Sequence, residues 1–138
     1  MSLEQYNYIF LDTNTVFYKK VLVKTDDSLP VGTAVIRLIS TQPGILPKYE
    51  QAGRKIFNYD YKCRFAGAIV HSLVSYYDCN IPPVGARFIS SFDRNTEYKI
   101  GAEIIPNSFD YTPVACSNGI HGFLRYEDAK NTAYESTT

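Results

Sequence analysis

The chain has 138 residues and no net charge, because its 14 lysines and arginines balance 14 aspartates and glutamates. Its composition is 45% hydrophobic and 20% charged, with 12 tyrosines, 8 phenylalanines and no tryptophan. A chain of this size and apolar content buries enough surface to order itself, which excludes general disorder. Zero net charge also argues against a generic polyanion binder, whose affinity would depend on an excess of basic residues.

Alternating and β-branched segments predict strands over most of the chain. The first two, residues 6–12 and 15–25, flank the turn-forming Asp12-Thr13-Asn14 and are expected to form a hairpin. Residues 31–40 carry apolar side chains on both faces, which is typical of an interior strand. Arg37 lies in the middle of that strand, where we expect it to pair with a carboxylate or reach the sheet edge; a ligand-binding role is the alternative.

The middle of the chain is less regular. Residues 41–55 contain two prolines and two glycines and are expected to form an ordered loop. Residues 63–77 have apolar spacing that fits either a helix or one face of a strand, and their β-branched content favours the strand. Further strands are predicted at residues 86–92, 98–101, 103–105 and 119–124.

Residues 126–134 form the predicted helix, with Glu127 and Asp128 in its first turn, where acidic side chains suit the helix dipole. Residues 135–138 are expected to be a frayed tail. The predicted fold is therefore α+β: mainly an antiparallel β-sheet or a partly closed barrel with one C-terminal helix. We expect a single domain over residues 1–138.

Targeting and redox features point to an intracellular protein without membrane contact. No run approaches the ~20 apolar residues that a membrane span needs. The N-terminus lacks the basic and apolar regions of a secretory signal. Three cysteines, Cys63, Cys79 and Cys116, are an odd number and cannot form a complete set of disulfides within one chain.

Motifs for catalysis and cofactor binding are absent from the sequence. It has neither a Gly-x-Gly-x-x-Gly fingerprint nor a P-loop, and His71 lies in an apolar run, which favours a hydrogen-bonded core residue over a base. The three cysteines and His121 match zinc ligands by type but lack a Cys-x2-Cys pair. We expect no cofactor, no metal site and no catalytic residue. Nucleic acid is not an expected partner either, despite the basic and aromatic residues interleaved at Tyr18-Lys19-Lys20.

The most distinctive segment covers residues 114–129. It predicts a turn at Ser117-Asn118-Gly119, a short strand with His121 and Phe123 on one face, and a helix directly after it. A histidine in this position either contacts a ligand or holds the turn by a hydrogen bond to the backbone.

Here the chain resembles an uncharacterised domain family of giant DNA viruses and phages, sometimes found next to pentapeptide repeats. The closing motif of that family is Cys, two residues, Gly-Ile-His-Phe-Phe, then Thr-Arg-Glu-Glu-Ala leading a helix. This chain departs from it at Gly122, where the family has an aromatic residue, and at Arg125-Tyr126, where it has Thr-Arg. The matching residues are Cys116, Gly119, Ile120, His121, Phe123, Glu127 and Ala129. Upstream likenesses are Lys62-Cys63-Arg64, Tyr98-Lys99-Ile100-Gly101 and Asn107-Ser108-Phe109-Asp110, so the resemblance covers roughly residues 30–134.

The resemblance implies a viral origin and a small β-rich domain, but it assigns no catalytic residue because the family has no assigned activity. We therefore predict a non-catalytic binding or assembly module in the host cytoplasm or the virion. It would act through an aromatic-rich surface, as a homo-oligomer or with a protein partner. The alternative is an ADP-ribosyltransferase-like enzyme or a binder of a small nucleotide that sequesters a host-defence signal, since the strand and helix around His121 resemble a segment of that superfamily. The candidate ligand-binding residues are His121, Phe123, Tyr98, Tyr126 and Arg37.

Overall fold

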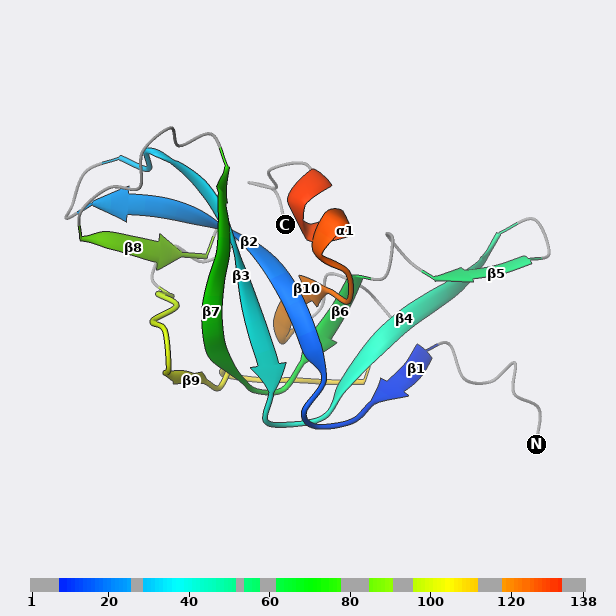
Figure 1. Cartoon of the computed structure of the whole chain (residues 1–138). Coiled ribbons are helices and arrows are strands. Elements are labelled where there is room, and N and C mark those ends of the chain that lie inside the picture. The colour runs from blue at the N-terminus through cyan, green and yellow to red at the C-terminus, as the bar shows by residue number, and fades with distance from the viewer. Residues whose placement is uncertain are drawn as a thin grey trace.

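The computed structural model describes residues 8–25, 29–51, 54–57, 62–77, 85–90, 96–111 and 118–132. These residues form an open, curved antiparallel sheet with one short helix, α1 (Tyr126–Asn131), packed on it (Figure 1). The strands are β1 (Tyr8–Leu11), β2 (Val16–Thr25), β3 (Gly32–Ser40), β4 (Gly44–Gln51), β5 (Arg54–Phe57), β6 (Lys62–Phe65), β7 (Ala68–Tyr77), β8 (Ala86–Ile89), β9 (Glu103–Ile104) and β10 (Ile120–Phe123). The predicted α+β class is confirmed, and the sheet is not closed into a barrel.

The strands follow the order β1-β4-β6-β10-β2-β3-β7-β9, while β5 pairs with β4 and β8 pairs with β2. β3 therefore lies between β2 and β7, as its two apolar faces predicted. Its register with β2 runs from Val16 opposite Ile39 to Val23 opposite Gly32. These long strands form the centre of the sheet.

The predicted hairpin between the first two strands is wrong. β1 pairs with β4, whereas β2 pairs with β3, β8 and β10. Asn14 turns the chain with a φ of 64°, and its N–H donates to the carbonyl of Ser40 at 2.8 Å. The Ser40 hydroxyl accepts from the N–H of Thr15 at 2.9 Å and donates to the carbonyl of Asp12 at 3.1 Å. The turn is thus tied to the end of β3, and β1 continues outward to pair with β4.

The predicted loop over residues 41–55 is also wrong, because β4 and β5 occupy most of it. Pro47 lies opposite Tyr8 of β1, between the part of β4 that pairs with β6 and the part that pairs with β5. Gly44 lies so close to the carbonyl of Arg64 and the ring of Phe65 that a Cβ would clash with both. Gly44 and Pro47, which suggested a loop, are therefore compatible with strand β4.

The strand prediction for residues 63–77 is confirmed by β6 and β7. The strand predicted at residues 98–101 is replaced by a turn over residues 99–102: the N–H of Ala102 donates to the carbonyl of Lys99 at 2.9 Å, and Gly101 has a φ of 87°. Predictions for residues 6–7 and for the tail at 135–138 lie outside the described residues. Within the described chain, no helix is long and apolar enough to cross a membrane.

The start of α1 compensates for the residues that depart from the viral motif. Arg125 has an extended backbone and gives no side-chain cap. Its guanidinium instead forms a bidentate ion pair with Asp128, with Nε–Oδ2 and Nη2–Oδ1 distances of 2.7 and 3.1 Å. This pair orders the first turn of the helix, which a capping Thr would otherwise do.

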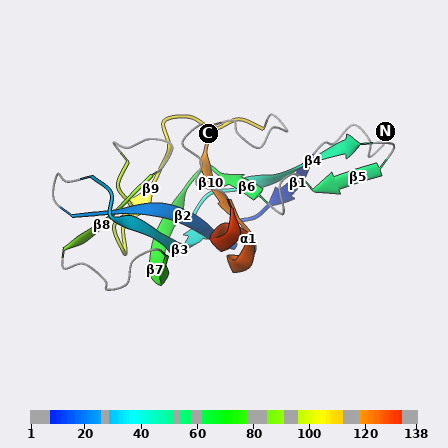
Figure 2. The ribbon, with the colours of Figure 1, turned by 90° about the horizontal axis from the view of Figure 1, so that it is seen from above.

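Side chains along β2 alternate between two faces of the sheet. Phe17, Val21 and Val23 belong to the main apolar core, whereas Tyr18 packs with Phe123 under α1. In Figure 2, α1 lies on one side of β2 and β10, and the segment that follows β9 lies on the other. The helix and the connection after β9 thus cover opposite faces of the same strands.

Candidate functional site

A pocket of about 500 Å³ lies on the β9 side of the sheet, between β2, β9 and β10. Its charged and titratable lining residues are Lys19 from β2, Tyr98, Glu103 from β9 and His121 from β10. Neutral polar lining comes from Ser90, Thr96, Asn107, Ser108 and Asn118. We call it the Lys19 pocket. Its size and mixture of apolar and polar groups are typical of small-molecule sites.

Lys19 is the central cation of this pocket. Its Nζ donates to the backbone carbonyl of His121 at 3.0 Å and lies 5.8 Å from the centroid of the Tyr98 ring. Glu103 lines the same pocket, but Lys19 forms no ion pair with any residue that the structure describes. Burial and, to a smaller extent, the charge of Lys62 together lower the pKa of Lys19 from 10.5 to about 8. The described part of the chain thus holds a desolvated cation for which it supplies no carboxylate partner.

The position of Lys19 follows from the alternation of β2. Lys19 is two residues from both Phe17 and Val21, which lie in the main core and are almost completely buried, so its side chain lies on the same face. The sequence alone does not mark Lys19, because it adjoins Lys20 in the basic and aromatic run Tyr18-Lys19-Lys20. The signal that identifies it is a lysine at an inward position within an otherwise apolar alternation.

Two of the five candidate residues, His121 and Tyr98, meet in this pocket. Tyr98 is buried and directs its ring toward Lys19. His121 is half-buried and accepts the Lys19 hydrogen bond through its backbone. These two residues and Lys19 come from three separate segments that the sheet brings together.

The other three candidates lie on the face covered by α1. Phe123 is buried against Val35 and Ala129. The Tyr126 hydroxyl is 2.8 Å from Oγ of Ser75, and the Tyr126 ring meets the ring of Tyr18 edge-on at 6.0 Å. These contacts attach the helix to the sheet.

Arg37 also lies on this face. Its Cζ is 5.5 Å from the centroid of the Tyr18 ring, and its Nη1 is 3.5 Å from Oγ of Ser72. It forms no ion pair with a described carboxylate, so stacking on the tyrosine replaces the expected pairing. Arg37, Phe123 and Tyr126 do not line the Lys19 pocket.

The contacts of His71 and Cys63 indicate a structural role for each. His71 is exposed, with its Nδ1 2.9 Å from Oγ of Ser72, so the expectation of a core histidine is wrong. The reason is that β7 directs Val70 into the core and its neighbours outward. Cys63 is buried, and burial raises the pKa of its thiol; Cys79 and Cys116 lie outside the described residues. Among described side chains, no group of three or more His, Cys, Asp or Glu is placed to hold a metal ion.

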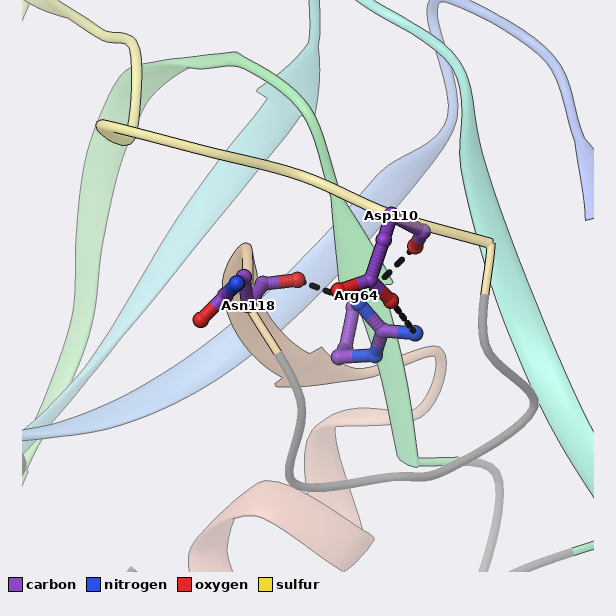
Figure 3. Close-up of polar contacts among 3 residues, drawn as sticks. All are labelled: Arg64, Asp110 and Asn118. Carbon is purple, nitrogen blue, oxygen red and sulfur yellow. Dashed lines mark hydrogen bonds and ion pairs between the residues drawn. The ribbon is translucent and has the colours of Figure 1, made fainter.

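Arg64 holds the rim of the pocket in place (Figure 3). It comes from β6 and its side chain is fully buried. Its Nη1 donates to the carbonyls of Asp110, at 3.2 Å, and Asn118, and its Nη2 lies 3.7 Å from the Asp110 carboxylate. Its Cζ also lies 5.2 Å from the centroid of the Phe109 ring. Arg64 therefore ties two segments that are distant in sequence to one strand, and Asn118 on one of them lines the pocket.

An exposed aromatic cluster lies at the β1 end of the sheet. Phe10 and Tyr111 stack at 6.2 Å between ring centroids and are 56% and 44% exposed. Tyr8 and Phe109 contact Tyr111 at 6.1 and 5.2 Å. We call these four residues the Phe10 cluster. It is the described surface that best corresponds to the predicted aromatic-rich face.

Comparison of the chain with protein-family models, with curated proteins and with solved structures finds no match. The resemblance to the domain of giant DNA viruses and phages therefore stays a prediction from the motifs. The function has to be inferred from the geometry of the Lys19 pocket and of the Phe10 cluster.

Proposed function

We propose that this protein is a binding module that holds a small anionic ligand in the Lys19 pocket. The observation that carries the proposal is a half-buried lysine that lines a pocket of about 500 Å³ and has no described carboxylate partner. Removing a charge from water is unfavourable unless an opposite charge compensates it. A bound anion supplies that charge.

The surroundings of Lys19 support the same ligand class. Lys62 adds positive potential, as its effect on the Lys19 pKa shows. Asn107, Ser108 and Asn118 provide neutral hydrogen-bonding groups that orient an anion without competing for the lysine. A nucleotide satisfies these requirements through its phosphate, which keeps the predicted sequestration of a host-defence signal among the candidate roles.

A thermal-shift screen tests the proposal. The full chain is melted with orthophosphate, small carboxylates, NAD and cyclic nucleotides, and we expect at least one of them to raise the Tm by several degrees. Binding at one hundred times Kd stabilises a protein by about 2.7 kcal/mol. Lys19→Gln should abolish the shift, and Lys20→Gln is the matched control because that side chain faces α1. If none of these anions moves the Tm of the wild-type chain, the proposal is wrong.

Self-association is a second candidate, favoured by the Phe10 cluster. β1 is at the end of the strand order, with β4 as its described partner, and its Phe10 is mostly exposed. Exposed aromatic side chains beside a sheet edge favour pairing with another strand. We propose a second copy of this chain as the partner.

Light scattering coupled to size exclusion measures this association. We expect a dimer at high micromolar concentration, and Phe10→Ser with Tyr111→Ser should dissociate it. Ile100→Ser is the matched control, because Ile100 is 52% exposed but does not belong to the cluster. A monomer of the wild-type chain at this concentration would contradict self-association.

A further inference from the structure

We propose that Lys19 is a carbonyl-reactive amine, which forms an imine with a small anionic carbonyl compound, such as a 2-oxo acid, in the Lys19 pocket. The inference rests on the proposed function, because the ligand must enter the pocket that Lys19 lines. It adds a covalent step and a narrower class of ligand to simple anion binding.

The hydrogen bonding of Lys19 suits a nucleophile. Its Nζ donates to one backbone carbonyl, that of His121, at 3.0 Å. A carbonyl accepts an N–H from a neutral amine as well as from an ammonium group, whereas a carboxylate would favour the charged form. Lys20 provides the contrast, because its Nζ is held by two carbonyls at the end of α1, those of Lys130 at 3.2 Å and Thr132 at 3.1 Å. The amine of Lys19 therefore lies at the pocket, whereas the amine of Lys20 is bound to carbonyls at the end of α1.

Burial and the charge of Lys62 favour the neutral amine of Lys19. Lys62 and Cys63 approach it from β6, and Tyr98, Glu103 and His121 line its pocket. Burial, followed by the Lys62 charge, lowers the pKa of Lys19 to about 8. At pH 8 about half of the Lys19 side chains are then neutral, against less than about one in a hundred for an ordinary lysine. The neutral amine is the form that attacks a carbonyl.

The step is balanced without any further reactant. The nitrogen lone pair attacks the carbonyl carbon, and the carbonyl oxygen takes a proton while the nitrogen loses one to water or to the Glu103 carboxylate. The C–O bond of the carbinolamine then breaks, and the oxygen leaves as water with a second proton taken from solvent, while the remaining N–H proton returns to solvent. A C=N bond forms, and no atom changes its oxidation state in this condensation. The 2-oxo acid keeps its carboxylate, which meets the positive potential of the pocket.

Reductive trapping tests the inference. The full chain is treated with glyoxylate and cyanoborohydride at pH 7.5, digested, and mapped by mass spectrometry. We expect the adduct on Lys19 at tenfold or more the level on Lys20, Lys24 or Lys99 in the same molecules. Labelling of Lys19 should rise with pH to about 8 and then level off, whereas labelling of ordinary lysines should rise until about pH 10.

The variant Lys19→Arg separates the imine from anion binding, because arginine keeps the charge but does not form an imine. It should retain the thermal shift with anions and lose the tenfold adduct, with melting curves confirming that it folds. Equal labelling of all lysines in the wild-type chain overturns the inference. An anion shift without a Lys19 adduct overturns the imine and leaves the binding function standing, whereas loss of both overturns both.

Discussion

Lys19 and Lys20 are neighbours on β2, yet they belong to two regions with opposite chemistry. Lys20 lies on the α1 face and donates to the carbonyls of Lys130 and Thr132. Those carbonyls form the negative end of the helix dipole, so this cation is compensated by the fold. Lys19 lies on the opposite face, beside a pocket, without a described carboxylate partner. A difference of one position along the strand thus separates a structural lysine from a candidate functional one.

The two regions differ in the same way beyond the lysines. On the α1 face, Tyr126 bonds to Ser75, and Arg37 stacks on Tyr18. These contacts attach the helix and need no ligand. On the pocket face, Arg64 pairs with Asp110 and positions the rim, whereas Lys19 has no carboxylate partner among the described residues. A pocket cation without a described carboxylate partner therefore indicates a candidate ligand site, whereas aromatic residues near a histidine do not indicate one by themselves.

The largest expected effect comes from breaking the pocket side at Arg64. Arg64→Ala removes a fully buried guanidinium that bonds to Asp110 and Asn118, and we expect a loss of about 3 kcal/mol in the free energy of unfolding. The variant should also lose anion binding, since Asn118 lines the pocket. Urea denaturation measures the first effect and thermal shift the second. Arg87→Ala is the control: its ion pair with Glu97 is partly exposed and should contribute about 1 kcal/mol or less.

A substitution at Gly122 tests how closely β10 packs against β2. A Cβ at this position would lie 2.6 Å from Cδ2 of Phe17 and 2.7 Å from the carbonyl of Tyr18. Gly122→Ala should therefore destabilise the protein by about 1–3 kcal/mol through overpacking. Phe17→Leu in the same chain removes part of the clash, so the double variant should lose less stability than the sum of the single variants. Strict additivity in urea denaturation would show that the ring of Phe17 does not limit this position.

The same substitution, made separately at each of the two lysines, sharpens the comparison. Lys20→Met removes the bonds to the end of α1 and should lower the free energy of unfolding by about 1 kcal/mol, with anion binding unchanged. Lys19→Met removes a desolvated charge and should leave stability equal or higher at pH 7, with anion binding lost. Chemical denaturation and thermal shift on the pair measure both properties. Equal losses of stability in the two variants would remove the distinction.

The pH dependence of Lys19 tests the same comparison through titration. The pKa of its folded form is about 8, below the ordinary 10.5, so between these values the unfolded chain binds more protons. The contribution of Lys19 to stability should therefore rise from pH 8 to about pH 10.5, and Lys19→Met should lack this rise. Anion affinity should change in the opposite direction, falling about tenfold per pH unit above pH 8 as the charge is lost. Urea melts and titrations at pH 7, 8.5 and 10 measure both trends.

The sequence by itself determined the fold class and the character of most segments. Alternation in residues 16–25 and two apolar faces in residues 32–40 predict the central strands, since burial of apolar side chains depends on local period. Partners of the strands could not be predicted in the same way. The ends of β1 and β4 are set by the tie between Asn14 and Ser40, and the place of Pro47 depends on which strands border β4. Such contacts join residues distant in sequence, which local patterns do not encode.

The residues of the candidate site likewise fall into those that the sequence indicates and those that only the tertiary structure reveals. The motif around residues 114–129 identified His121, and Tyr98 entered as its aromatic companion; both line the pocket. The sequence places Arg64 in a likeness to the viral family and Lys19 in a basic-aromatic run, but neither pattern marks them as pocket residues, because both are ordinary basic residues on predicted strands. Only the tertiary structure decides that Lys19 is desolvated without a described counter-ion and that Arg64 is buried with its partners. The physical reason is that burial and charge compensation are properties of the assembled sheet, and a single strand has neither.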